Sequence, residues 1–305
     1  MKIFVFFLIL PFAAFAGLTA VSLGKPFDLL ITGDPLIAII SISSAMILIS
    51  FLFGLICNEY SWVDRLWSIL PALYAWILAV RAWPDPRLIA GAALVTLWAA
   101  RLTFNFARKG GYSGMEDYRW AEVRKFIGNE FLWQAFNFGF ISTYQNALFV
   151  LFVLPLYMAY LFKGTPFGII DIAASVFFLG FLVLETIADQ QQWDFHAKKK
   201  NGTTDKRFLD EGLFGFSRHP NYFAEIMIWW CVYLFGAAAT GKWIDWSVIG
   251  MVLLTLLFQG STWLTEMLSM RKYPEYAEYR KRVSRIVPWF PKKASFSDET
   301  ESGKV

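Results

Sequence analysis

Long apolar segments, separated by short polar ones, dominate the amino-acid sequence. Eight of these segments approach the roughly 20 residues that an α-helix needs to cross a bilayer. Their approximate bounds are 3–23, 35–57, 66–83, 88–107, 136–162, 167–188, 221–240 and 245–265. The pattern therefore predicts an all-α fold, a polytopic membrane helix bundle with seven to eight transmembrane helices.

The same pattern divides the chain into three parts. Residues 1–30 are interpreted as an N-terminal membrane helix or signal anchor, residues 31–291 as a single membrane domain, and residues 292–305 as a disordered polar tail. Ala-Phe-Ala at positions 14–16 is also compatible with a signal-peptide cleavage site. An uncleaved first helix is favoured, because further spans follow it.

Composition and charge agree with a membrane location. Hydrophobic residues make up 57% of the chain and charged residues 17%, against about 25% charged in an average soluble domain. Most of the 28 Lys and Arg residues fall in segments that share one side of the membrane if the N-terminus is inside. The positive-inside rule then predicts cytoplasmic polar loops and a cytoplasmic C-terminus, in a bacterial inner membrane or the endoplasmic reticulum.

The sequence also argues against several functional classes. Its two histidines are too few for the His-rich boxes of membrane desaturases and hydroxylases, so no metal is expected. No Gly-x-Gly-x-x-Gly, Walker or Gly-x-Ser-x-Gly motif occurs in the sequence. Any nucleotide would therefore have to be bound by other polar residues.

One segment, 209–225, places polar residues at the start of an apolar helix: Leu-Asp-Glu-Gly-Leu-Phe-Gly-Phe-Ser-Arg-His-Pro-Asn-Tyr-Phe-Ala-Glu. Pro220 is predicted to be the first helical residue, because a missing N–H costs nothing there. Helix N-termini attract anions. Four residues spaced i, i+3, i+4 and i+7 would share one helical face: Arg218, Asn221, Tyr222 and Glu225. Since such groups are costly in lipid, a functional site is favoured over a helix end at headgroup level.

Two further polar sets interrupt apolar spans. One follows the sixth span and could contact the ribose or amide groups of a nucleotide, or simply emerge into water: Glu185, Asp189, Gln192 and His196. The other lies on the fourth span and comprises Arg101, Asn105 and Arg108. Arginine is suited to phosphate or carboxylate. Snorkelling to the interface is a reasonable alternative for Arg108 and a poor one for Arg101.

Carboxylates also occur at the mouth of the second and third spans. Glu59, Asp64 and Arg65 lie there. Apolar surroundings raise the pKa of a carboxyl group, which can then donate a proton. The alternative is a turn with a capping acid and an exposed Arg65. A last set leads out of the final span, where Tyr279 is expected at the membrane surface: Glu266, Arg271, Tyr273, Tyr276 and Tyr279.

Taken together, these motifs resemble the steroid 5-alpha-reductase-like family, and most closely its largely uncharacterised microbial branch of the DUF1295 type. The C-terminal signature of that family is similar to the segment 209–225. Further matches are Glu185-Thr-Ile-Ala-Asp189, Val63-Asp64 with Trp67, Arg101-Leu102, and the ending Val287-Pro288-Trp289-Phe290-Pro291. The resemblance covers roughly residues 50–291.

The resemblance implies a membrane-helix bundle that binds NADPH from the cytosolic side and transfers a hydride to the C=C of an enone lipid. By position, NADPH would contact Arg101, Asp189, Asn221 and Glu225. Neighbours in the same motifs and polar sets complete the expected cofactor site: Arg108, Glu185, Arg218, His219, Tyr222, Glu266 and Arg271. For the catalytic acid, the branch signature points to Asp64, while Glu59 stands nearest to the glutamate of the steroid enzymes. Tyr222 is a third candidate.

Two other classes remain open. Membrane methyltransferases of the isoprenylcysteine or phospholipid type share the Arg-His-Pro-x-Tyr core and bind S-adenosylmethionine. A non-enzymatic lipid-binding or scaffold protein is the third possibility. The reductase is favoured, because a methyltransferase needs no arginine pair for a 2′-phosphate and pyrophosphate. Expected partners are a hydrophobic lipid or steroid-like substrate and membrane lipids, with no nucleic acid and no metal.

Overall fold

The computed structural model describes residues 33–114 and 116–292. Within these ranges the secondary structure is helical, apart from one isolated bridge between Ser217 and Ser284. The chain forms two compact units, the first from residues up to 179 with 229–254, and the second from residues 180–228 with those from 255 onward. The predicted helix at 3–23 and the polar tail after residue 292 lie outside the described residues.

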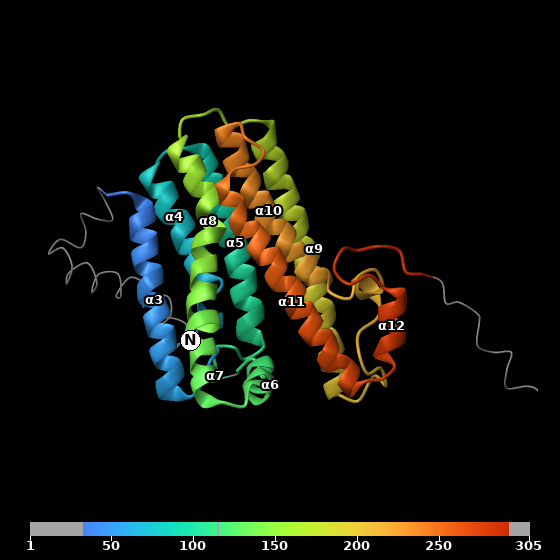
Figure 1. The fold of residues 1–305 in the computed structure, drawn as a ribbon. Helices are drawn as coiled ribbons and strands as arrows, with labels where there is room; N and C mark the ends of the chain where they lie inside the picture. The colour runs from blue at the N-terminus through green and yellow to red at the C-terminus, as the bar shows by residue number, and fades with distance from the viewer. Residues whose placement is uncertain (1–32, 115, 293–305) are drawn as a thin grey trace, which may run out of the picture. The chain divides into compact units, whose positions relative to one another are not determined.

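The helices follow one another along the chain as Figure 1 shows. Their bounds are α3 (Pro35–Cys57), η1 (Asp64–Leu66), α4 (Ile69–Arg81), α5 (Pro86–Arg108), α6 (Tyr118–Ile127), α7 (Glu130–Phe136), η2 (Asn137–Tyr144), α8 (Gln145–Leu161), α9 (Ile169–Lys200), η3 (Gly212–Gly215), α10 (Pro220–Thr240), η4 (Trp246–Val248), α11 (Ile249–Lys272) and α12 (Tyr276–Arg282). Here η1, η3 and η4 are 3-10 turns, and η2 is a π-helix.

Six of the described helical segments are long and apolar enough to span a membrane: Pro35–Cys57, Pro86–Arg108, Glu130–Leu161, Ile169–Lys200, Pro220–Thr240 and Trp246–Lys272. The prediction of an all-α membrane fold is confirmed. The predicted span at 66–83 is different, because α4 has only 13 residues. At 1.5 Å per residue it is about 20 Å long, which is short for a hydrocarbon core of about 30 Å.

Local sequence explains where α3 and α5 begin. Each starts with Asp-Pro, at Asp34-Pro35 and Asp85-Pro86. The aspartate side chain accepts a hydrogen bond from a backbone N–H of the first turn, from Leu36 in α3 and from Arg87 and Leu88 in α5. The proline occupies the first helical position, where its fixed φ suits the helix.

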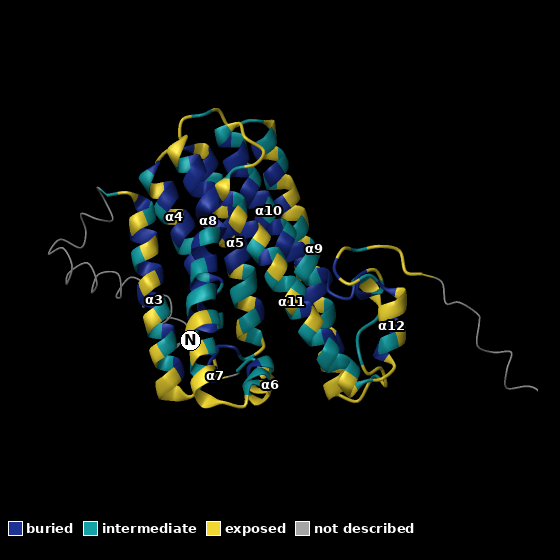
Figure 2. Cartoon of the chain, viewed as in Figure 1, coloured by how far each residue is buried: buried dark blue, intermediate teal, exposed yellow. Residues whose placement is uncertain are grey.

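The core of the first unit lies among α4, α5 and α8, with α3 packed along α8 (Figures 1 and 2). Trp229 of α10 is fully buried there, with its ring 4.9 Å from that of Trp98 and 4.4 Å from that of Phe152. Outward-facing side chains of α3 such as Ile37 and Leu52 are exposed. A helix with one packed face and one apolar exposed face is what a lipid environment favours.

A buried ion pair in the first unit connects the start of α5 to the start of α9. Arg87 at the start of α5 binds Asp171 of α9 with Nε–Oδ1 and Nη2–Oδ2 distances of 2.6 and 2.9 Å. Arg87 also donates to the carbonyl of Pro166 at 2.7 Å and to the hydroxyl of Thr165. Both charged side chains are almost fully buried. The guanidinium therefore ties α5 to the connection between α8 and α9.

Two glycines let α10 and α11 approach α8 closely. A Cβ atom at Gly236 would lie 2.8 Å from the carbonyl oxygen of Pro155, and one at Gly250 would lie 2.3 Å from that of Leu151. Real Cβ atoms do not approach backbone oxygens this closely. Small residues serve this purpose in membrane helices, where packing rather than water drives association.

We expect Gly250→Ala to lower the free energy of unfolding of the protein by about 1–3 kcal/mol, because the helices must separate to admit the methyl group. Gly260→Ala is the matched control in the same helix, since nothing lies within 4 Å of its added Cβ. That control should be neutral or stabilising, because alanine favours helix. Thermal unfolding in detergent measures both changes, and equal midpoints for the two variants would contradict the packing argument.

In the second unit, α12 packs on the segment that follows α9. Tyr276, Tyr279 and Val283 are buried, with Phe208 among the side chains packed against them. Tyr279 is 3% exposed, and its hydroxyl donates to the carbonyl of Phe214 at 2.6 Å. The expectation that Tyr279 lies at the membrane surface is therefore wrong. The i, i+3 spacing of the tyrosines places them on the inner face of a short amphipathic helix.

Candidate functional site

Arg218, two residues before the predicted helix, is the centre of a buried polar cluster in the second unit. Its Nε donates to Oε1 of Glu266 at 2.7 Å and its Nη2 to Oε2 at 3.2 Å. Its Nη1 donates to the carbonyl of Arg280 at 2.9 Å and also to that of Val283. The guanidinium is thus engaged by a carboxylate from α11 and by carbonyls at the end of α12.

Glu266 gathers two further groups at the same carboxylate. His219 Nε2 lies 3.1 Å from Oε1, so Nε2 carries the proton in this contact, and Arg280 Nε lies 3.0 Å from Oε2. The Glu266 side chain is 2% exposed. The ring of His219 stacks on that of Tyr222, with 5.4 Å between the centroids. Charge-assisted hydrogen bonds of this kind are the strong ones in proteins.

Backbone contacts fix the same segment to the C-terminal part of the chain. The Arg218 N–H donates to the carbonyl of Ser284 at 2.9 Å, and the Ser217 hydroxyl donates to that of Ile286 at 2.7 Å. The Trp289 N–H donates to the carbonyl of Phe216 at 2.9 Å. The segments 209–225 and 287–291, which both carry motifs of the family resemblance, are thus linked by hydrogen bonds.

The helix of this motif begins at Pro220, as predicted. The expectation that its polar residues share one face is wrong for Arg218. Because Arg218 precedes the helix, helical spacing does not apply to it, and its side chain reaches Glu266 of α11. Asn221 instead contacts α9, where its Nδ2 donates to Oδ1 of Asp189 at 3.3 Å.

Three carboxylates of α9 and α10 are buried in the second unit. Glu185 is 4% exposed, Asp189 5% and Glu225 4%. With the amide of Asn221 they offer several acceptors and one amide donor. Such a set suits hydroxyl and amide groups of a ligand, because carboxylates accept hydrogen bonds from both. The other predicted residues of this unit, Gln192, His196 and Arg271, lie outside this buried group, His196 and Arg271 being exposed.

Sequence reasoning singled out Gln192 and missed its neighbour. Gln191 accepts a hydrogen bond from the backbone N–H of Leu213 at 2.9 Å. Its amide also lies where a Cβ on Gly212 would be, and Gly212 has a φ of 64°. Glycine is the residue that adopts this conformation without strain. The Gln-Gln pair and the Gly at 212 were the available signals.

The predicted arginines on α5 belong to the first unit. Arg108 donates from Nε to Oδ1 of the buried Asn105 at 2.9 Å and lies over the ring of Phe104. Arg101 is half-buried two turns earlier. These side chains are the candidates for phosphate contacts, whereas Arg218 already holds Glu266.

The turn between α3 and α4 holds the predicted acids. Arg65 is 3% exposed, pairs with Glu59, donates from Nε to the carbonyl of Gly111 at 3.1 Å and lies 4.5 Å above the ring of Trp62. The alternative of an exposed Arg65 is therefore wrong. Glu59 is thus engaged in an ion pair with Arg65.

Asp64, at the start of η1, has different surroundings. Burial raises its pKa to about 6, and the negative charge of Asp117 acts in the same direction. Ser61, Arg119 and Trp120 oppose the shift. The rise expected from the sequence is thus found for Asp64. A carboxyl with this pKa is protonated in an appreciable fraction near neutrality and can donate a proton.

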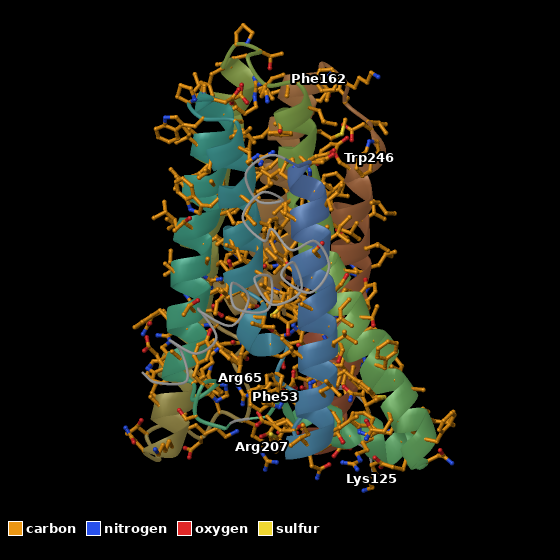
Figure 3. The ribbon with its side chains drawn as sticks, turned by 90° about the vertical axis from the view of Figure 1, so that its left-hand side faces the viewer. Phe53, Arg65, Lys125, Phe162, Arg207 and Trp246 are labelled. Atoms are coloured by element: carbon orange, nitrogen blue, oxygen red, sulfur yellow. The ribbon has the colours of Figure 1, made fainter. Side chains whose placement is uncertain are left out.

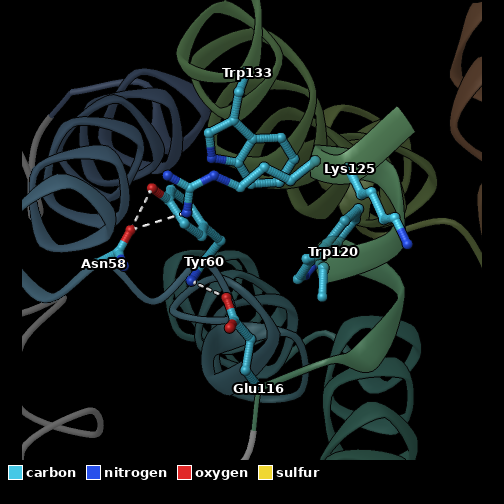
Figure 4. Close-up of a pocket in the computed structure, with 8 residues that line it drawn as sticks. Asn58, Tyr60, Glu116, Trp120, Lys125 and Trp133 are labelled. Atoms are coloured by element: carbon cyan, nitrogen blue, oxygen red, sulfur yellow. Dashed lines mark hydrogen bonds between the residues drawn. The ribbon is translucent and has the colours of Figure 1, made fainter. Parts of the chain in front are cut away.

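A pocket of about 400 Å³ opens beside this turn (Figure 4). Two short helices, α6 and α7, border it, and Asp117 and Asn129 are their N-caps. In Figure 3, Arg65 and Lys125 lie toward one end of the first unit, and Phe162 and Trp246 lie toward the other. The lining residues are Asn58, Tyr60, Glu116, Trp120, Ala121, Arg124, Lys125 and Trp133.

Comparison with known proteins places the chain in a family. Residues 50–283 match the family described as a protein of unknown function, DUF1295. A curated protein of Schizosaccharomyces pombe, itself described as uncharacterised, is 38% identical over 275 residues, which cover 79% of this chain and 78% of the yeast protein. No solved structure matches the chain. The protein therefore belongs to the DUF1295 family.

Proposed function

We propose that the protein is an NADPH-dependent membrane reductase that transfers a hydride to the C=C of a hydrophobic enone, steroid-like or another lipid. The observation that carries this proposal is the environment of Asp64. It is the acid at the mouth of the apolar helices whose pKa is raised to about 6, while its neighbour Glu59 is paired with Arg65.

Asp64 has the role of proton donor in this scheme. Reduction of an enone builds negative charge on the carbonyl oxygen, which a nearby acid stabilises and protonates. Protonated Asp64 supplies that proton and becomes a carboxylate. Trp120 and Ser61 then stabilise the anion, since their interactions with Asp64 lower its pKa.

The residues proposed to bind NADPH are assigned by the chemistry of their side chains alone. Asp189, Glu225 and Asn221 offer acceptors and a donor for ribose and amide groups. Arg101 and Arg108 are permanent cations of the kind that bind phosphates. NADPH supplies the hydride when bound. Arg218 and His219 hold the segment 217–223 through Glu266, so that they position Asn221 and Tyr222.

Titration of the purified protein with NADPH, NADH and, separately, S-adenosylmethionine tests this function. We expect NADPH to bind at least about tenfold more tightly than NADH, because arginine bonds to a 2′-phosphate are charge-assisted. Arg101→Gln should reduce that preference, and Lys200→Gln, an exposed cation at the end of α9, should leave it unchanged. Equal affinities for the two dinucleotides would contradict the proposal, and binding of S-adenosylmethionine alone would replace it with the methyltransferase.

We further propose that the polar loops and the C-terminus face the cytoplasm, where NADPH is available. The Lys and Arg distribution supports this orientation through the positive-inside rule. Single cysteines introduced at Lys200 and Lys242, in a background lacking Cys57 and Cys231, should react with a membrane-impermeant maleimide from opposite sides. Labelling of both positions from the same side would exclude this topology.

A further inference from the structure

We propose that the pocket formed by the turn after α3 and by α6 and α7 binds the headgroup of an aminophospholipid, a phosphodiester that carries a primary ammonium. The argument for this site does not use the proposed reductase activity, although Trp120 borders both the pocket and Asp64. Its volume of about 400 Å³ lies within the roughly 300–1,000 Å³ of small-molecule sites. All of its lining residues belong to the first unit.

A buried donor without an internal acceptor points to a ligand. Trp133 is 1% exposed, and its Nε1 has no hydrogen-bond partner among the described residues. An indole N–H can only donate, and leaving a buried donor unpaired is costly. A ligand oxygen in the pocket would satisfy it. A ligand in the pocket should therefore carry a hydrogen-bond acceptor next to Trp133.

A preoriented cation stands next to that donor. The Arg124 guanidinium lies 5.5 Å from the centre of the Tyr60 ring and 5.7 Å from that of Trp133. Asn58 Oδ1 and Glu130 Oε2 hold its two Nη atoms at 3.0 and 2.8 Å. Since a guanidinium has five N–H donors, further donors remain for a phosphate. Lys125 adds a second cation to the lining.

The opposite side of the pocket carries the complementary charge. Figure 4 shows Glu116 across from Trp133, with Tyr60 between them. One oxygen of Glu116 accepts the backbone N–H of Tyr60 at 2.7 Å. A carboxylate here disfavours a purely anionic ligand. It matches an ammonium, which the faces of Tyr60 and Trp120 would also attract. The charges thus fit a headgroup with phosphate at one end and ammonium at the other.

Exposed apolar side chains lie close in sequence to the lining residues and favour a lipid over a soluble phosphate ester. Phe126 next to Lys125 is 90% exposed, and Phe131 close to Trp133 is 80% exposed. Ile56, at the end of α3 before Asn58, is 78% exposed. Side chains of this type at the end of membrane helices lie at the level where headgroups meet acyl chains. Acyl chains would cover them while the headgroup fills the pocket.

Native mass spectrometry of the detergent-purified protein tests the proposal. The probes are phosphatidylethanolamine and phosphatidylglycerol with identical acyl chains, and soluble phosphoethanolamine. We expect the ethanolamine lipid to bind about tenfold more tightly than the glycerol lipid, and soluble phosphoethanolamine to bind weakly. Glu116→Gln should abolish the preference between the lipids, while Trp133→Phe, which keeps a ring and removes the N–H, should weaken both.

Glu122→Gln is the matched control, because Glu122 is exposed on α6, close in sequence to Glu116, and does not line the pocket. Its affinities for the two lipids should equal those of the unmodified protein. The proposal is overturned if phosphatidylglycerol binds as tightly as phosphatidylethanolamine, if Glu116→Gln keeps the preference, or if soluble phosphoethanolamine competes as well as the lipid. NADPH titration of the same samples separates these results from the fate of the proposed reductase.

Discussion

Glu266→Leu is expected to lower the free energy of unfolding by about 3–5 kcal/mol, because it leaves the buried guanidinium of Arg218 without its carboxylate. The Arg218 side chain is 7% exposed, so water cannot replace the lost partner. His219 and Arg280 lose the same acceptor. Chemical denaturation in detergent, followed by circular dichroism, measures the change.

The control for Glu266 is an exposed glutamate in the same unit. Glu278 pairs with Lys281 while both side chains are 71% exposed, and surface pairs contribute about 0–1 kcal/mol. Glu278→Leu should therefore shift the unfolding midpoint little. A Glu266→Leu protein as stable as Glu278→Leu would show that the cluster does not hold the second unit together.

Asp64→Asn is expected to reduce turnover at least about a hundredfold, the loss typical of a missing general acid. NADPH binding should survive, because that role is assigned to Arg101, Asp189, Asn221 and Glu225. Single-turnover kinetics and NADPH titration of the same sample separate the two effects. Normal turnover would move the proton donor to Glu59 or Tyr222, and lost NADPH binding would place Asp64 in the cofactor site.

The pH dependence has a definite sign. The protonated form of Asp64 is the active one, so turnover in the unmodified protein should fall as pH rises through about 6. The folded-state pKa also lies above the ordinary value of 3.8, so protonation of Asp64 favours folding. Its stabilising effect is complete below pH 4 and is lost as pH rises through 6. At pH 8, Asp64→Asn should then be more stable by up to about 3 kcal/mol.

Hydrophobic periodicity predicted most of the fold because long apolar runs leave few alternatives. The Asp-Pro starts of α3 and α5 and the start of α10 at Pro220 follow from local chemistry. The shortness of α4 could not be predicted in this way, because apolar residues flank the helix and extended the predicted span to 66–83. Likewise α6 and α7 are short, and their caps at Asp117 and Asn129 resemble those of ordinary turns.

For the candidate site, the sequence indicated which residues matter better than what they contact. Glu266 was identified as a polar residue leading out of the final span, yet its pairing with Arg218 depends on how α11 passes the start of α10. Tyr279 resembled an interfacial anchor because its burial depends on Phe214, 65 positions earlier. The pocket near Trp133 combines side chains from three separate segments of the chain. A local sequence pattern does not predict that such segments come together.

The closeness of α8 to its neighbours has an evolutionary consequence. Pro155 has no N–H, so the carbonyl of Leu151, one turn earlier, lacks its usual helical donor. Gly250 approaches that same carbonyl, and Gly236 approaches the carbonyl of Pro155 itself. A substitution at position 155 that shifted this part of α8 would therefore disturb both glycine contacts at once. Positions 155, 236 and 250 should change together or not at all as relatives diverge, so that each constrains which substitutions its partners tolerate.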